Sequence, residues 1–152
     1  MKTKVTIVEV TKEDITNLLS TAASGSTWLG LSYDSIEWEE YILKGGKKED
    51  CLEDIMANLL LDGRKVELYD MEAVDETDFF GNLEHYYDDC GNMCYLVSLD
   101  NIKEGLERAA NSDEGWIRDC FKDLMEDDSY NMDQPEAEAL IQYILFGELI
   151  YG

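Results

Sequence analysis

Apolar residues recur every three or four positions in five parts of the chain, which is the spacing of amphipathic helices. The first predicted helix begins at the capping-box sequence Thr11-Lys12-Glu13-Asp14 and ends near Gly25. The last begins near Asp133, carries Pro135 in its first turn and ends near Gly147. The five predicted helices span about 12–24, 49–61, 101–109, 113–124 and 133–146.

Some apolar side chains are assigned to the core by this spacing. Cys51 and Cys120 lie on apolar helix faces, where cysteine behaves as a small hydrophobe. The tail Leu149-Ile150-Tyr151 is expected to pack on the domain, because an exposed apolar terminus promotes aggregation. A homodimer contact is the alternative for this tail. The fourth predicted helix is expected to point Trp116, Ile117, Cys120, Phe121 and Leu124 inward.

Shorter runs, rich in β-branched and aromatic residues or alternating between apolar and polar, predict strands. These runs cover 4–10, 27–33, 65–70 and 93–99. Asp100 or Asn101 follows the last run and is expected to cap the next helix. Residues 36–43 fit a strand or a helix, and residues 71–92 are the least regular part of the chain.

The order of these elements predicts the fold class. Strands dominate the first two thirds and helices gather at the end, which favours an α+β fold with a helical C-terminal half. We expect a small, mostly antiparallel sheet packed against several helices. The chain has one Pro and no long Ser- or Gly-rich stretch, so residues 1–152 are predicted to form a single domain.

Charge is the unusual feature of the composition. The chain has 35 Asp and Glu against 12 Lys and Arg, a formal net charge of −23. The electrostatic field of this charge repels phosphate backbones, so we expect no direct contact with nucleic acid. We expect the partner to be a basic protein. Adaptation for solubility or for high salt is the alternative. The apolar fraction of 45% and aromatic fraction of 11% indicate a folded chain.

The chain begins Met1-Lys2-Thr3-Lys4 and runs straight into a strand pattern, without the long apolar stretch of a signal peptide. No apolar run approaches the roughly 20 residues that a membrane helix needs. We therefore expect a cytoplasmic protein without membrane contact, whose cysteines are reduced.

Catalytic and metal-binding motifs are scarce. No phosphate loop, nucleophile elbow or HExxH motif is present, and His85 is the one histidine. Cys90 and Cys94 lie close to His85, but zinc sites usually show a second pair of ligands at regular spacing. Residues 75–78 and 127–133 are acidic without the spacing of a calcium loop. The sequence thus predicts no enzyme, no metal and no cofactor. The alternative is a hydrolase or a metal-dependent enzyme that uses the acidic segment and His85.

Two acidic segments, 70–89 and 113–138, carry the main functional signal. Acidic residues three or four positions apart on a helix repel each other and so cost stability. Their presence suggests that their negative electrostatic field has a function. Such acids could imitate the phosphates of a duplex, with neighbouring tyrosines as anchors; a solvated surface above core aromatics is the alternative. The predicted partner-binding residues are Asp75, Glu76, Asp78, Tyr86, Tyr87, Asp88, Asp89, Asp119, Asp123, Glu126, Asp127, Asp128 and Tyr130.

The C-terminal sequence Leu-Phe-Gly-Glu (145–148), followed by two aliphatic residues, an aromatic residue and Gly152, completes an apolar helix. This ending resembles that of small, mostly uncharacterised acidic proteins of bacteriophages and bacterial mobile elements. The stretch from Ile15 to Trp28 is similar to the early part of the same proteins. The resemblance implies a phage or mobile-element origin, favours an inhibitor of host defence and lends no catalytic residue.

Charge and resemblance together lead to one expected function. We expect a phage-type anti-defence inhibitor, an anti-CRISPR or anti-restriction protein that acts as an acidic DNA mimic in a bacterial host cell. Its expected partner is a basic nucleic-acid-binding protein, either a CRISPR effector or a restriction enzyme. The alternative is an immunity protein or antitoxin that neutralises a basic nuclease toxin.

Overall fold

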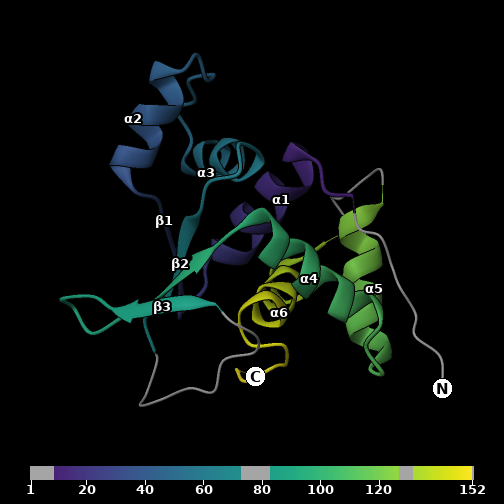
Figure 1. Ribbon diagram of the computed structural model, residues 1–152. Coiled ribbons are helices and arrows are strands. Elements are labelled where there is room, and N and C mark those ends of the chain that lie inside the picture. The colour runs from purple at the N-terminus through teal and green to yellow at the C-terminus, as the bar shows by residue number, and fades with distance from the viewer. Residues whose placement is uncertain (1–8, 73–82, 127–131, 152) are drawn as a thin grey trace.

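The computed structural model describes residues 9–72, 83–126 and 132–151 (Figure 1). These residues form six α-helices and a four-stranded antiparallel sheet, so the predicted α+β fold with a helical C-terminal half is confirmed. The helices are α1 (Lys12–Ala23), α2 (Ser35–Leu43), α3 (Leu52–Leu61), α4 (Leu99–Ala110), α5 (Gly115–Met125) and α6 (Gln134–Leu145). The strands are β1 (Leu29–Ser32), β2 (Val66–Asp70), β3 (Glu84–Tyr87) and β4 (Met93–Val97). No described helix is both long and apolar enough to cross a membrane.

The sheet has the strand order β1-β2-β4-β3, and all neighbouring strands are antiparallel. Buried and partly exposed residues alternate along β2, so the sheet buries one face. The register places Leu31 opposite Leu68, and Leu68 opposite Tyr95, on that buried face. Among the described residues β1 and β3 are the two edge strands.

Helix α6 lies among the other helices and packs against α1, α4 and α5 (Figure 1). Every residue from Ala139 to Leu145 is buried, so the helix is enclosed on nearly all sides. The contact with α4 is closest at Gly105, where a Cβ atom would lie 2.4 Å from Cα of Ile144. The missing side chain at Gly105 therefore lets α4 approach the backbone of α6.

The residues after α6 fold back and are held by Gln142, which is 3% exposed. Its Oε1 accepts hydrogen bonds from the backbone N–H groups of Ile150 at 2.8 Å and Tyr151 at 2.9 Å. The Tyr151 ring lies 4.8 Å from the Trp28 ring, and its hydroxyl donates to Oδ2 of the buried Asp70 at 2.6 Å. The C-terminal tail is thus tied to α6, β1 and β2.

Two predictions of burial are wrong in part. Leu149 and Ile150 are 36% and 40% exposed, so only Tyr151 of the predicted apolar tail packs on the core. Cys51 is exposed at the start of α3, because it occupies the N-cap position before the helix rather than its apolar face.

The inward face of α5 also differs from the prediction. Trp116 is 47% exposed, because the buried stripe is narrower than expected and Trp116 lies beside it. The residues of this stripe are Ile117, Cys120 and Leu124. The predicted cap of α4 is likewise wrong. Ser98 caps the helix, and its hydroxyl oxygen accepts from the backbone N–H of Asn101, which is the third helical residue.

Other boundaries agree with the sequence pattern. Capping boxes at Thr11 and Asp133 begin α1 and α6, and residues 36–43 are helical. Strand β3 lies within the segment predicted to be irregular. Of the predicted strand 4–10, residues 4–8 lie outside the described residues and residues 9 and 10 are not in a strand.

The close approach of α4 and α6 gives a first prediction. Gly105→Ala should lower the free energy of unfolding by about 1–3 kcal/mol, because the new methyl group meets backbone that cannot move aside. Urea unfolding measures the change. Gly115→Ala is the matched control, since a Cβ atom there would lie 3.5 Å from the flexible Arg118 side chain, an ordinary van der Waals distance. Equal effects at the two glycines would contradict the proposed packing.

Candidate protein-binding site

Helix α2 stands out from the other helices and packs mainly on α3 (Figure 1). None of its residues is buried. Two of its apolar side chains are largely exposed: Ile36 by 62% and Leu43 by 86%. Apolar side chains that gather on a polar surface are a common mark of an interaction site, so the surroundings of α2 decide whether it forms one.

Arg64, which follows α3, holds α2 in place. Its Nη1 donates to Glu37 Oε1 at 2.6 Å and to Glu40 Oε1 at 2.9 Å, while its Nε donates to Asp62 Oδ2 at 2.9 Å. The hydrogen bond to Glu40, followed by those to the other two carboxylates, raises the pKa of Arg64. Lys44 pairs with Asp62 at 2.6 Å and is the main cause of the lowered pKa of Asp62. The position of α2 therefore depends on ion pairs.

Aromatic side chains supply the apolar part of the attachment. The Trp38 ring stacks on Tyr41 with 5.4 Å between centroids and meets the Tyr33 ring edge-on at 6.3 Å. After α2 the chain reverses through Gly45, which has a φ of 100°, and Gly46. A Cβ atom at Gly46 would lie 2.4 Å from the Tyr41 ring, so glycine allows the reversal to fold tightly over that ring.

This reversal places residues 47–50 opposite α2, where they form a second wall. Asn58 of α3 anchors them, because its Nδ2 donates to the Lys47 carbonyl at 3.4 Å and to Glu49 Oε2 at 3.1 Å. Lys12 of α1 also donates to Glu49, and this bond is the main cause of the lowered pKa of Glu49. The Glu49 carboxylate is thus held in its charged form and fixed to α1 and α3.

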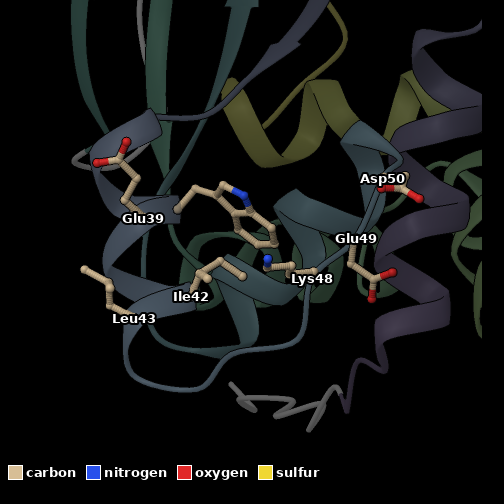
Figure 2. A pocket seen from close by; sticks show the side chains of 7 residues that line it. Glu39, Ile42, Leu43, Lys48, Glu49 and Asp50 are labelled. Carbon is tan, nitrogen blue, oxygen red and sulfur yellow. The ribbon is translucent and has the colours of Figure 1, made fainter.

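The two walls enclose a groove of about 440 Å³ that is open to solvent (Figure 2). Glu39 lies on one side, and Glu49 and Asp50 lie on the other. An apolar centre within a polar rim is the usual layout of a protein interface, and this rim has three carboxylates and one ammonium group. The residues that line the groove are Trp38, Glu39, Ile42, Leu43, Lys48, Glu49 and Asp50.

None of these residues belongs to the partner-binding set predicted from the sequence. Residues 36–43 combine acids with apolar side chains that do not form a single buried stripe, which explains why the pattern fits neither element well. The sequence signal that could have indicated this groove was Ile36 and Leu43, two apolar residues at the ends of an acidic segment. The reversal at Gly45-Gly46 then creates the groove, and its shape cannot be read from spacing alone.

The predicted acidic residues are only partly described. On α5, Asp119 and Glu126 are exposed and Asp123 is half-buried. The exposed cations Arg118 and Lys122 lie between them, so α5 alone does not present a uniformly acidic face. The predicted residues that lie outside the described residues are Asp75, Glu76, Asp78, Asp127, Asp128 and Tyr130.

Asp88, another predicted contact residue, has a structural role in the turn between β3 and β4. Its Oδ1 accepts from the backbone N–H groups of Cys90 at 2.9 Å and Asn92 at 2.8 Å. The bond from the Asn92 backbone is the main cause of the lowered pKa of Asp88. The charge of Asp88 is therefore partly used within the turn, whereas the neighbouring Asp89 is exposed.

The predicted tyrosine contacts lie on β3. Tyr86 and Tyr87 are 44% and 51% exposed. The Tyr86 hydroxyl donates to Glu67 on β2, and this bond, together with desolvation, raises the pKa of Tyr86. Tyr86 thus links two strands through its hydroxyl, while much of the surface of both side chains faces solvent.

The candidate zinc ligands have other partners. His85 Nδ1 lies 3.2 Å from the Leu83 carbonyl oxygen. Cys90 is exposed, whereas Cys94 is buried with its Sγ 3.8 Å from Asp88 Oδ2. Within the described ranges, no three His, Cys, Asp or Glu side chains are grouped so that they could hold a metal ion.

Carboxylates from α5 and α6 gather near the buried thiol of Cys120, and we call Asp119, Asp123, Asp133 and Glu136 the α5–α6 acidic cluster. Partial burial, and then a hydrogen bond with Asp123, raises the pKa of Glu136 to about 7. Burial, and then the charges of the whole cluster, raises the pKa of Cys120 to about 12. The structure therefore brings together Asp119 and Asp123, which the sequence predicts as contact residues, with two acids of α6.

Two long stretches of the chain carry acidic residues and no basic ones. Lys and Arg are absent from residues 66–102 and from residues 123–152. Lys65 pairs with Glu84 at the border of the first stretch. Exposed carboxylates in the described parts of these stretches include Glu72, Asp89, Glu126, Asp133 and Glu148.

Comparison of the chain with known protein families, with curated proteins and with solved structures found no match.

The raised pKa of Glu136 gives a prediction about how stability depends on pH. Because folding raises its pKa from 4.5 to about 7, the folded state gains stability from protonated Glu136 at low pH and loses it as the pH rises towards 7. Glu136→Gln should therefore become more stable relative to the parent protein between pH 5 and 7, with a constant difference above pH 8. Urea unfolding at several pH values measures this. Parallel pH profiles would contradict it; Glu148→Gln, which changes an exposed acid, is the control.

The role of Arg64 gives a prediction about α2. Arg64→Met should increase hydrogen exchange of the α2 backbone amides several-fold, because Glu37, Glu40 and Asp62 lose their shared cation. Exchange in α4 and α6 should stay unchanged. Arg118→Met, which removes a guanidinium of α5 that donates to the Ser112 carbonyl, serves as the control. An unchanged α2 would show that aromatic packing alone holds the helix.

Proposed function

We propose that this protein is an acidic inhibitor of host defence that binds the basic nucleic-acid cleft of a CRISPR effector or restriction enzyme and excludes the nucleic acid. The observation that carries the proposal is the distribution of charge. The net charge is −23, and no Lys or Arg occurs in residues 66–102 or after Lys122. Such a surface attracts a basic cleft by long-range steering and repels nucleic acid.

The crowding of acids supports a functional role for the charge. In the α5–α6 acidic cluster, burial and then the hydrogen bond with Asp123 raise the pKa of Glu136 to about 7, so charging Glu136 costs free energy in the folded protein. A chain selected for stability alone has simple ways to relieve this, such as Gln at position 136. Retaining the cluster at a cost in stability fits a surface whose field acts on a partner.

A charge-reversal experiment tests the proposal. Asp119→Lys with Glu126→Lys should weaken binding to the inhibited defence protein at least about tenfold, because both exposed acids would then repel a basic cleft. The measurement is displacement of labelled DNA from purified CRISPR effectors and restriction enzymes by the full-length protein, at low and at high salt. Displacement by the parent protein should be stoichiometric and should weaken with salt.

The control carries the same change in net charge elsewhere. Glu9→Lys with Glu104→Lys alters two exposed acids outside both acidic segments, 70–89 and 113–138, and should keep most of the activity. Equal losses in the two double variants would show that only total charge matters. Failure to displace DNA from any defence protein, with inhibition of a nuclease toxin instead, would replace the proposal by an immunity function.

A further inference from the structure

The groove beside α2 has a chemistry that differs from the rest of the acidic surface. Its centre is apolar and exposed: Trp38 and Ile42 are partly buried, and Leu43 is 86% exposed. Its rim is charged, with Glu39, Glu49 and Asp50 against Lys48. A purely electrostatic decoy gains nothing from exposed apolar side chains, since they cost free energy in water. The groove therefore needs an occupant of its own.

We propose that this groove binds one amphipathic peptide segment of the partner protein. Apolar side chains of the segment pack on Trp38, Ile42 and Leu43, and its Lys or Arg side chains meet the rim carboxylates. The inference rests on the proposed function for the basic character of the partner, but it concerns a different surface from the α5–α6 acidic cluster.

Charge complementarity selects this occupant over the others. A second copy of this chain would bring another net charge of −23 to a rim that is already acidic. Nucleic acid is repelled for the same reason. A basic segment with an apolar face satisfies both parts of the site, because its cations meet the Glu39 and Asp50 carboxylates while Leu43 and its neighbours are removed from water.

The shape of the groove also fits a segment better than a small enclosed ligand. Its volume of about 440 Å³ lies in the range of ligand sites, but one wall is the last turn of α2, where Leu43 projects into solvent. The opposite wall is fixed through Asn58 and Lys12. A peptide laid along α2 can contact both walls and extend beyond them at either end.

A model peptide tests the groove without knowledge of the partner. The probe is a synthetic helical peptide of leucine and lysine with all leucines on one face, compared with a rearranged peptide of the same composition that has no apolar face. Calorimetric titration of the full-length protein should show one-to-one binding of the patterned peptide that persists in high salt. The rearranged peptide should bind weakly and lose its affinity in salt.

Matched variants locate the binding. Leu43→Ser should weaken the patterned peptide about tenfold, whereas Ile36→Ser, at an exposed apolar residue of the same helix outside the groove, should not. Likewise Glu39→Lys should weaken binding more than Asp113→Lys, which changes an exposed acid elsewhere by the same charge. Circular dichroism checks that each variant is folded; all four positions are exposed, so the fold should persist.

Three results would overturn the inference. They are equal effects of Leu43→Ser and Ile36→Ser, equal binding of the two peptides in high salt, or a dimer in sedimentation that Leu43→Ser dissociates and Ile36→Ser does not. The proposed function fails separately, when no defence protein loses its DNA. In that case peptide binding at Leu43 would still stand, and the partner would be a basic protein of another kind.

Discussion

The burial of α6 depends on the hydrogen bonds of one side chain. Gln142 faces the core, where an unpaired amide would cost free energy. Its oxygen accepts from two backbone N–H groups of the tail, and its Nε2 donates to the Tyr151 carbonyl at 3.3 Å. Tyr151 in turn packs on Trp28 and bonds to Asp70, which is also buried. The same contacts therefore satisfy two buried polar groups and join the helical layer to the sheet.

The cations of this acidic chain are concentrated where they hold its parts together. Lys12, Lys44 and Arg64 pair with carboxylates around α2, α3 and the second wall of the groove. These pairs build a region in which exposed apolar side chains and charges of both signs meet. In the α5–α6 acidic cluster acids prevail instead, although α5 also carries the exposed cations Arg118 and Lys122, and burial there raises the pKa of Glu136. The molecule thus has two surfaces with different physical character.

Local signals allowed most of the fold to be predicted. Capping boxes at Thr11 and Asp133 and the apolar stripes of α1 and α3 depend on neighbouring residues, so they are visible in the sequence. Strand β3 was not predicted, because all four of its residues are exposed and buried residues do not alternate with exposed ones along it. The candidate site was harder to predict from the sequence than the fold. Acids could be identified one by one, but the α2 groove arises from a chain reversal that places Glu49 opposite Glu39.

Strand β3 has an outer edge that no other described strand covers. An open edge offers backbone N–H and C=O groups to any extended chain, including another molecule of the same protein. At neutral pH two such molecules repel each other strongly, so the net charge opposes edge-to-edge aggregation. This repulsion disappears near the isoelectric point of about 4.1, where enough carboxylates are protonated for the net charge to vanish. The charge that suits the protein to a basic partner also governs its colloidal stability, and acidification would expose it to precipitation through the sheet.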